Sequence, residues 1–517
     1  MVQLTIDNIH IQAPEGTTVM EAARSVGIEI PSMCYLKGHG NHPSCMVCLV
    51  KNLKSGQITT SCALPVADGM EFSTNDPVVV EARKDALELL MSDHVGDCEA
   101  SCSIGCPANM NIPLMNRLIA AQKFDESLKV VKETIALPHI LGYICPAPCE
   151  KACRRTQIDQ AVSICLLKRL VAAENNLVEI PTLQNSKKVA IIGSGPAGLA
   201  AAYYLLKYGY NCVLFDKNEK SGGTLRYSIP DEELPKPVID GEVEIIRQMG
   251  AEFRFNSPIT PELFETEIRN RFDAIIIATG DVAVNNQLGE LFKTTKTGIE
   301  AEDGTMATSE PGIFACGSVI RTQKMAVRAV AQGKAAAESA HLFLQNKLLV
   351  KPVRRFNSRF DKLLRSEYPE YLKESVLDSR YSPQGGYLAG FTADEAVKEA
   401  MRCMRCDCRK LDNCKLRLYS DQYKIDRKKY LIGERKIMTK QLTHEWVVYE
   451  PEKCIKCGLC IDITLQEKEL VGLTLVGRGF DVRMDASLGA SLTEALTHTA
   501  KKCVDACPTG ALAMKKD

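Results

Sequence analysis

Cysteine is the residue type in this chain with the greatest capacity for chemistry. The chain has 517 residues and 22 cysteines, and 20 of these cysteines fall in tight groups. Cys212 and Cys316 stand apart inside apolar runs, and we interpret them as buried structural thiols. Dense, regularly spaced cysteines in a reducing compartment usually ligate metal, whereas disulfides belong mainly to exported chains. The sequence therefore predicts several metal or iron–sulfur centres.

The first cysteine group has the spacing C-x10-C-x2-C-x13-C. Its members are Cys34, Cys45, Cys48 and Cys62. Four thiolates on a folded-back loop suit a [2Fe–2S] cluster. Zinc is the alternative, although all-cysteine zinc sites usually use two C-x2-C knuckles. Residues 43–50 resemble the N-terminal ferredoxin domain of complex I 75-kDa-type subunits and iron-only hydrogenases, which implies a β-grasp fold for residues 1–76.

The second cysteine group lies in residues 77–180, which look mostly helical and are broken by cysteine-rich turns. Its members are Cys98, Cys102, Cys106, Cys145, Cys149, Cys153 and Cys165. This stretch resembles the N-terminal domain of the glutamate synthase small subunit, which also occurs in dihydropyrimidine dehydrogenase. The resemblance implies an α-helical domain in which cysteines from distant turns hold two [4Fe–4S] clusters.

Two ligands depart from that family pattern. The family usually has four cysteines in the first half of the group and this chain has three, so His94 is our candidate for the missing ligand, with a non-ligating histidine as the alternative. The late fourth ligand aligns near Lys168, which cannot ligate while protonated, so Cys165 is the candidate there. The resemblance then implies one cluster on His94, Cys98, Cys102 and Cys153, and another on Cys106, Cys145, Cys149 and Cys165.

A glycine-rich turn after a buried strand indicates a dinucleotide site in residues 181–345. The apolar run 188–192 is followed by Gly193-Ser194-Gly195-Pro196-Ala197-Gly198 and a helix, and a second strand ends at Asp216. Glycines there let backbone amides approach a pyrophosphate at the positive end of the helix, and an acid about 20 residues on binds a ribose hydroxyl. We therefore predict a Rossmann-like domain.

Three further segments, 221–230, 273–280 and 312–318, resemble the flavin-contacting segments of the glutamate synthase small-subunit family. The resemblance implies FAD. The expected FAD-binding residues are Gly193, Gly195, Pro196, Ala197, Gly198, Asp216, Lys217, Gly223, Thr224, Leu225, Arg226, Thr279, Gly280, Gly317 and Ser318. Ser318 stands where the family usually has an acid, so flavin affinity or potential is expected to differ.

The family also carries a complete NADPH-binding domain between the Ala-Thr-Gly strand and the closing flavin motif. Here only about 30 residues separate Gly280 from Gly312, whereas a nicotinamide domain needs upwards of about 100. We therefore expect no conventional NAD(P)H site in this chain.

A third cysteine group lies in residues 346–444, which are polar and look like a linker. Its members are Cys403, Cys406, Cys408 and Cys414. Four thiols within twelve residues bind metal, and we expect a [4Fe–4S] cluster, with zinc as the alternative.

The last group has the bacterial ferredoxin run, Cys454-x2-Cys457-x2-Cys460, with Cys507-Pro508 as the fourth ligand. Residues 445–517 resemble the two-cluster ferredoxin domain of complex I and hydrogenase subunits. A second cluster would need cysteines at 464, 497 and 500, where the chain has Thr464, Thr497 and Ala500. We therefore expect one cubane in a ferredoxin-like domain of short strands and loops, with Cys503 left over.

Composition excludes other classes. The formal net charge of 0 and the pI of 7.0 give no electrostatic reason to expect nucleic acid or an anionic membrane as a partner. No window reaches the roughly 18 to 20 apolar residues of a membrane span, and residues 1–7 alternate like a strand rather than a signal peptide. We expect a cytoplasmic, multidomain α/β and α+β protein.

The inventory of one [2Fe–2S] cluster, three to four [4Fe–4S] clusters and FAD favours an electron-relay subunit of a larger oxidoreductase complex. The resemblances imply as partners an NADH-oxidising flavoprotein of the complex I 51-kDa type, a hydrogenase or formate dehydrogenase subunit, or ferredoxin. Two alternatives are a self-contained NAD(P)H-dependent reductase of the glutamate synthase small-subunit type and a redox sensor or scaffold stapled by clusters. No acid–base pair or nucleophile identifies an organic substrate.

Overall fold

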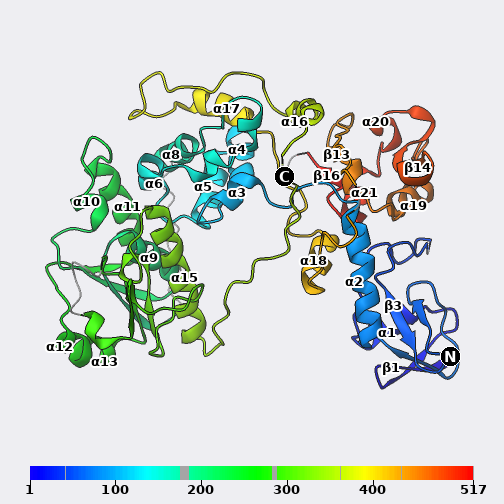
Figure 1. Ribbon diagram of the computed structural model, residues 1–517, viewed down its shortest axis with the longest axis horizontal. Helices are drawn as coiled ribbons and strands as arrows, with labels where there is room; N and C mark the ends of the chain where they lie inside the picture. The colour runs from blue at the N-terminus through cyan, green and yellow to red at the C-terminus, as the bar shows by residue number, and fades with distance from the viewer. Residues whose placement is uncertain (41, 175–184, 282–287, 361, 432, 516–517) are drawn as a thin grey trace. The chain divides into compact units, whose positions relative to one another are not determined.

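The computed structural model describes residues 1–40, 42–174, 185–281, 288–360, 362–431 and 433–515, which form two compact units (Figure 1). Unit 1 comprises residues 1–100, 355–373 and 406–517, and unit 2 comprises residues 101–354 and 374–405. The boundary that we expected at 180/181 lies outside the described residues. The segment 346–444 is not one linker, because it is divided between both units.

The N-terminal part of unit 1 is a five-stranded sheet with one helix. The strand order is β2-β1-β5-β3-β4, with β1 antiparallel to β2 and parallel to β5. A capping box between Thr18 and Glu21 begins the helix α1, because each side chain satisfies a backbone N–H of the other. The bounds are β1 Val2–Ile6, β2 Ile9–Ala13, α1 Val19–Ser25, β3 Leu49–Asn52, β4 Ile58–Thr60 and β5 Met70–Ser73.

The rest of unit 1 comprises a long helix, short helices and two small antiparallel ribbons, β13 with β16 and β14 with β15. We expected only strands and loops after residue 445, but α19 and α21 also form there and bury Leu459, Ile463 and Val504 between them and the ribbons. The bounds are α2 Pro77–Ser92, α16 Tyr368–Leu372, α18 Lys415–Gln422, β13 Val447–Tyr449, α19 Leu459–Gln466, β14 Leu473–Val476, β15 Arg483–Ala486, α20 Leu492–Ala495, α21 Ala500–Ala506 and β16 Leu512–Met514.

Unit 2 begins with short helices around an apolar core that includes Met115, Leu128, Ile140 and Leu167. Several of these helices begin at a proline in the first turn, where a missing N–H costs nothing. The bounds are α3 Ser101–Gly105, α4 Ile112–Ala120, α5 Phe124–Lys132, α6 Pro138–Ile144, α7 Pro148–Lys151 and α8 Ile164–Glu174.

A parallel five-stranded sheet follows in unit 2, with the order β12-β9-β6-β7-β8. Helices α9 and α15 lie side by side against it (Figure 1). They approach closely because a Cβ at Gly333 would come within 2.2 Å of the Ala197 carbonyl oxygen. The bounds are β6 Lys188–Ile192, α9 Pro196–Lys207, β7 Asn211–Phe215, α10 Thr224–Tyr227, α11 Lys236–Gln248, β8 Glu252–Arg254, α12 Pro261–Leu263, α13 Arg269–Arg271, β9 Ala274–Ile277, β12 Ile313–Ala315 and α15 Ala326–Leu344.

Between β9 and β12, the described residues form only one 3-10 turn, Leu288–Leu291, and a small hairpin of β10 Thr294–Thr295 with β11 Gly298–Ile299.

The segment 374–405 is held in unit 2 by buried charges. Arg402 on the end of α17, Ala393–Met401, is completely buried and pairs with the equally buried Glu399 at 3.0 Å. Glu399 also accepts hydrogen bonds from the backbone N–H groups of Ser163, at 2.7 Å, and Tyr381, at 2.9 Å. Arg155 donates to the Arg402 carbonyl oxygen at 2.6 Å. These bonds tie residues 374–405 to the turn before α8.

Arg402→Met is expected to destabilise unit 2 by about 3–5 kcal/mol, because it leaves Glu399 buried without its cation. Lys398→Met is the matched control, since Lys398 is exposed on the same helix and should cost less than about 0.5 kcal/mol. The measurement is denaturant unfolding combined with hydrogen exchange of the α17 amides. Equal stability of the two variants would contradict this account of the segment.

Candidate iron–sulfur and dinucleotide sites

The first four cysteines come together in unit 1 as two close pairs of thiols. The Sγ atoms of Cys34 and Cys45 are 3.4 Å apart, and those of Cys48 and Cys62 are 3.3 Å apart. All four are buried. The hydrogen bond between the Cys48 and Cys62 thiols lowers the pKa of Cys48 to about 7. Two pairs of thiols are the donor set of a [2Fe–2S] cluster, in which each iron takes two cysteines.

The loop that carries these thiols is fixed by the strands on either side. β3 starts directly after Cys48, whose carbonyl oxygen accepts from the backbone N–H of Ser61 at 3.1 Å and from its hydroxyl at 2.7 Å. These two hydrogen bonds from Ser61 to one carbonyl oxygen bring the next residue, Cys62, close to Cys48. The backbone N–H of Ser44 points at the Cys34 Sγ at 3.5 Å, as the N–H groups around a cluster do.

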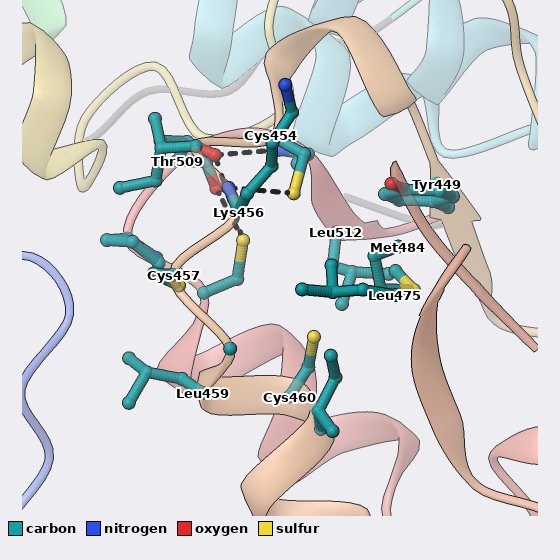
Figure 2. A pocket seen from close by; sticks show the side chains of 16 residues that line it. Tyr449, Cys454, Lys456, Cys457, Leu459, Cys460, Leu475, Met484, Thr509 and Leu512 are labelled. Atoms are coloured by element: carbon teal, nitrogen blue, oxygen red, sulfur yellow. Dashed lines mark hydrogen bonds between the residues drawn. The ribbon is translucent and has the colours of Figure 1, made fainter. Parts of the chain in front are cut away.

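The ferredoxin run lines one pocket of unit 1. Figure 2 shows Cys454, Cys457 and Cys460 around it, with apolar side chains beside them. Cys507 also lines it. The apolar lining includes Ile455, Leu459, Leu475, Met484 and Leu512. The backbone N–H of Lys456 donates to the Cys454 Sγ at 3.3 Å. Four thiols in an apolar pocket fit a [4Fe–4S] cluster.

Thr497, at one of the positions where a second cubane would need a cysteine, takes part in a hydrogen-bond network around Glu469. Thr497 donates to Glu469 at 2.6 Å, and the hydroxyl of Thr499 donates to the same carboxylate at 2.7 Å. Burial would raise the pKa of Glu469, but these hydrogen bonds outweigh it and lower the pKa to about 2. Cys503 is buried and lies 3.7 Å from the Cys460 carbonyl oxygen, so it has a structural partner.

Four of the cysteines in unit 2 lie together. Cys145 and Cys165 are within hydrogen-bonding reach of each other, and Cys165 also reaches Cys149. The buried Lys168 interacts with these three and with Cys106. Burial would lower the pKa of Lys168, but the charges of the four thiols outweigh it and raise the pKa. The structure therefore gathers Cys106, Cys145, Cys149 and Cys165, with a cation beside them, and Cys165 is turned toward the other thiols.

Cys153 and Cys403 are neighbours elsewhere in unit 2. Burial raises the pKa of Cys153, and the charge of Cys403 adds to the effect. The network around Arg402 positions Cys403, which is the next residue along the chain. Cys102 lies on α3, which packs against α7 so closely that a Cβ at Gly105 would be 2.7 Å from the Ala152 Cβ.

The family resemblance placed Cys98 on one cluster with Cys102 and Cys153, which stays a prediction because those two cysteines belong to unit 2, whereas Cys98 does not. It lies in unit 1 with Cys408 and Cys414, and the backbone N–H of Cys408 donates to the Cys98 carbonyl oxygen at 3.0 Å. Cys406 also belongs to unit 1. The four cysteines of residues 403–414 are thus divided between the units. The expectation of one centre on these four cysteines stays a prediction.

His94 is buried in unit 1, and burial lowers its pKa to about 3, so its ring is neutral. Cys212 and Cys316 are buried in unit 2, which confirms them as interior thiols. In the described part of the chain, no three His, Cys, Asp or Glu side chains have the geometry of a site for a single metal ion.

A cavity of about 640 Å³ opens over the glycine turn of unit 2. Twelve of the fifteen expected dinucleotide residues line it: Gly193, Gly195, Pro196, Ala197, Asp216, Lys217, Gly223, Thr224, Thr279, Gly280, Gly317 and Ser318. The cavity lies at the carboxyl ends of β6 and β7 and at the start of α9, where a pyrophosphate finds free backbone N–H groups and a positive helix end.

Three expected residues do not line this cavity, and each has a packing role instead. A Cβ at Gly198 would be 1.9 Å from the Gly193 carbonyl oxygen, so this glycine permits the contact of helix and turn. Leu225 is buried. Arg226 donates to the Ser221 carbonyl oxygen at 2.6 Å and pairs with Asp240.

Sequence reasoning missed other residues of the cavity wall. They are Ile192, Phe215, Asn218, Tyr227, Ser228, Ser257, Pro258, Ile259, Ala278, Asp281, Leu288 and Ala329. Asn218 had a usable signal, because it follows the acid at the end of the second strand by two residues and its backbone and side chain both donate to Asp216, at 2.9 and 3.0 Å. The loop at 257–259 had no usable sequence signal, because the hydrogen bond that its backbone N–H donates to Asp216 joins residues far apart in the chain.

Two features of the cavity fit a dinucleotide. The protein's own backbone requires glycine at position 193, because its φ is +101° and a Cβ would be 2.4 Å from the Ala278 carbonyl oxygen. The protein's own backbone does not require glycine at position 195, because its φ is −77° and no atom lies closer than 4.0 Å to a Cβ there. The space above Gly195 is therefore open to a ligand, and glycine here lets the backbone approach a phosphate.

Family models match three segments of the chain, which include the first two cysteine groups and the glycine turn. Residues 1–77 match the 2Fe-2S iron-sulfur cluster binding domain, and residues 90–179 match the dihydropyrimidine dehydrogenase domain II with its 4Fe-4S cluster. Residues 191–253 match the NAD(P)-binding Rossmann-like domain. This chain is a multidomain iron–sulfur protein. Its helices and sheets therefore combine iron–sulfur domains with a Rossmann-like domain.

Relatives of this iron–sulfur protein are oxidoreductases and their subunits. The β subunit of an NADPH-Fe(3+) oxidoreductase from Geobacter sulfurreducens is 31% identical over 252 residues, covering 47% of this chain and 36% of that subunit. The β subunit of an NADP(+)-dependent formate dehydrogenase from Moorella thermoacetica is 32% identical over 41% of this chain and 32% of its own length. The small chain of a Bacillus subtilis NADPH glutamate synthase is 36% identical over 34% of this chain and 37% of its own length. The matches thus span about a third of each relative.

Among the residues with described structure, no helix is both long and apolar enough to cross a membrane.

Gly195→Ala is expected to fold normally and to lose bound dinucleotide, because its methyl group has room in the protein but occupies the approach of the phosphate. Gly241→Ala is the matched control, since Gly241 is an exposed glycine on α11 with no atom within 4 Å of a Cβ. The measurement is dinucleotide released per chain on denaturation, with circular dichroism of the folded variants. Unchanged content in Gly195→Ala would mean that this turn does not hold the phosphates.

Lys168→Met is expected to lower the midpoint potential of the centre held by Cys106, Cys145, Cys149 and Cys165. A unit charge about 6–8 Å away at an effective dielectric of about 20 corresponds to a shift of on the order of 100 mV. Redox titration followed by electron paramagnetic resonance (EPR) measures it, and Lys151→Met, an exposed lysine in the same unit, is the control. A shift of the same size in both variants would exclude a specific role for Lys168.

Proposed function

We propose that this chain is an electron-transfer subunit of an oxidoreductase complex, which relays electrons between FAD, several iron–sulfur clusters and partner redox subunits. The observation that carries the proposal is that one chain brings together separate groups of buried thiols and, in unit 2, a cavity shaped for a dinucleotide. Organic catalysis needs no such series of thiol groups, whereas electron transfer between successive centres does.

The centres of unit 1 share one apolar core, which supports the idea of a relay. This core contains Cys34 and Cys45 of the first group and Cys414, and Cys457 of the ferredoxin run packs against it. Burial raises the pKa of Cys457 to about 12, and the charge of Cys34 contributes, so these two thiols lie within electrostatic range of each other. Met33, Val47, Leu87 and Leu416 fill the space around them and exclude water.

When bound, the clusters would supply one-electron carriers and the flavin a carrier of one or two electrons. The residues of this chain hold and shield them. We infer one [2Fe–2S] cluster in a β-grasp domain, residues 1–76, and one [4Fe–4S] cluster in a ferredoxin-like domain, residues 445–517. We infer two or three further [4Fe–4S] clusters on the thiols of residues 98–165 and 403–414. We infer FAD over the Gly193–Gly198 turn, in the domain 181–345. Thiols in this number stay reduced only in a compartment such as the cytoplasm.

Partners follow from the relatives and from the first domain. Because two relatives are β subunits, we infer that this chain also works in a complex. The partners that fit are an NADH-oxidising flavoprotein of the complex I 51-kDa type, a formate dehydrogenase or hydrogenase subunit, and ferredoxin.

Direct oxidation of NAD(P)H is the second candidate function, and one observation favours it. A second cavity in unit 2, of about 660 Å³, is lined by the exposed cations Arg321, Lys324 and Arg328. It adjoins the dinucleotide cavity, since the backbone N–H of Gln323 on its wall donates to the hydroxyl of Ser318 at 3.2 Å. Cations there would suit the phosphates of a nicotinamide nucleotide.

The experiment that separates the two is an anaerobic absorbance titration of the cluster-loaded chain with NADH, NADPH and reduced ferredoxin. A relay subunit should be reduced by reduced ferredoxin and not by NADH or NADPH alone. NADH should reduce it only after an NADH-oxidising flavoprotein subunit is added. Gly195→Ala should then show cluster bleaching without the flavin band.

If NADH or NADPH alone bleaches the flavin and cluster absorbance, the relay function is wrong and direct oxidation of NAD(P)H is supported. In that case Arg328→Met should raise the nicotinamide concentration at half-saturation at least tenfold, while Arg271→Met, an exposed arginine of the same unit that does not line this cavity, should leave it unchanged.

A further inference from the structure

Three cysteines of unit 1 meet at a place that neither the sequence spacing nor the family resemblance identifies. Cys98 follows the long helix α2, whereas Cys408 and Cys414 come more than 300 residues later. All three thiols are buried, at 7%, 6% and 8% exposure. They are therefore not surface thiols, and they come from two cysteine groups of the sequence, Cys98 from the second group and Cys408 and Cys414 from the third.

Backbone hydrogen bonds fix Cys98 and Cys408 against each other. The Cys408 N–H donates to the Cys98 carbonyl oxygen at 3.0 Å, and the Cys98 N–H donates to the Ser358 carbonyl oxygen at 2.9 Å. The Ser358 N–H in turn points at the Cys98 Sγ at 3.4 Å. A backbone N–H directed at a thiol stabilises it as a thiolate, the form that ligates iron.

Cys414 is brought to the same place by the helix that it begins. It is the N-cap of α18, and its N–H donates to the Lys410 carbonyl oxygen at 3.0 Å. Arg417 on this helix pairs with Glu99, next to Cys98, and donates to the Phe356 carbonyl oxygen at 2.8 Å. The helix that Cys414 begins is thus held against Glu99, the residue next to Cys98.

The site is held by a buried cation and by glycine. Lys453, paired with Glu450 at 2.5 Å, passes Gly96 so closely that a Cβ there would be 2.6 Å from its Cε. A Cβ at Gly510 would be 2.3 Å from the Cys408 Sγ. Lys453 and the N-terminus of α18 both supply positive charge, which the thiolates of a cluster need in a buried place.

An independent observation points to a ligand at the same place. His94 is buried, four residues before Cys98, and its Nδ1 has no hydrogen-bond partner among the described residues. Lys453 passes directly beside Gly96, which lies between His94 and Cys98 in the chain, so both residues are close to the same cation. A buried ring nitrogen without a partner costs free energy unless something binds it, and imidazole is a common metal ligand.

We propose that Cys98, Cys408, Cys414 and His94 hold one iron–sulfur cluster in unit 1, and that Cys403 serves a different centre, with Cys153, in unit 2. The proposal rests on the proposed function only in taking the thiol groups as cluster ligands. The site joins the start and the end of the chain within one unit. It also lies on the apolar core that contains Cys34 and Cys45, because Cys414 is part of that core.

The test counts iron in single and double alanine variants of the full-length, cluster-loaded chain. Cys98→Ala and Cys414→Ala should each lose about four irons, the content of one cubane, and the double variant should also lose about four, because both ligate one cluster. Cys403→Ala combined with Cys414→Ala should lose about eight. Cys503→Ala is the control and should lose none.

Two outcomes would overturn the proposal. One is a loss of about eight irons in the Cys98→Ala, Cys414→Ala double variant, or of only about four when Cys403 and Cys414 are changed together. The other is a zinc ion, found by elemental analysis, that disappears with Cys414. Because iron content and Mössbauer spectra are read without any partner or substrate, failure of this site and failure of the relay function are distinguishable.

A second measurement uses the wild-type protein, in case an alanine variant does not fold. In protein labelled with ¹⁵N-histidine, pulsed EPR should detect a nitrogen coupled to one reduced cluster. The coupling should vanish in His94→Cys while the iron count stays unchanged. A wild-type spectrum without such coupling overturns His94 as the fourth ligand. Gly510→Ala should alter the EPR signal that Cys98→Ala removes, and an unaltered signal would place Cys408 outside that centre.

Discussion

A buried ion pair between Arg402 and Glu399 is the interaction on which the arrangement of thiols in unit 2 depends. Both side chains are fully buried, so neither charge would be tolerated alone. Glu399 satisfies the backbone of Ser163 and Tyr381, and Arg402 donates to the carbonyl oxygens of Asp378, Gln160 and Ala161. A segment with little regular structure is thereby fixed to helices that precede it by more than 200 residues. Cys403, the next residue, acquires its position from this network rather than from its neighbours in the cysteine group.

Two thiol groups combine apolar side chains, which remove water, with a buried cation, which offsets the negative charge that thiolates bring. Lys168 has this role beside Cys106, Cys145, Cys149 and Cys165, and Lys453 beside Cys408. Neither lysine is a ligand, and each is too deeply buried to be explained as a solvated surface charge. Cluster reduction potentials respond to nearby charge and hydrogen bonds. These lysines therefore influence the reduction potentials of the two centres, which cysteine spacing does not determine.

Local chemistry made much of this molecule predictable from its sequence. The turn at Gly193 requires a positive φ and room for a carbonyl oxygen, so its motif identifies strand, turn and helix together. The run of Cys454, Cys457 and Cys460 lines one pocket because its spacing alone brings the thiols to one side of a loop. Long-range features were not predictable. The passage of the chain between units at 405/406 has no signal in the sequence, and the Arg402 network depends on residues that look like ordinary surface charges.

The apolar core of unit 1 suggests why residues after 406 pack against the first domain and α2. Cys34 and Cys45 come from the first domain, Cys414 from the start of α18, and Cys457 from the last domain, yet they surround the same few aliphatic side chains. Each of the three segments contributes only part of this core. Packing them on α2, through Leu87 and Met91, gives all three a shared wall that solvent does not reach. Since electron transfer between centres requires short distances through protein, a fold that closes the two ends of a chain around one helix brings the centres together without any of them sharing a ligand.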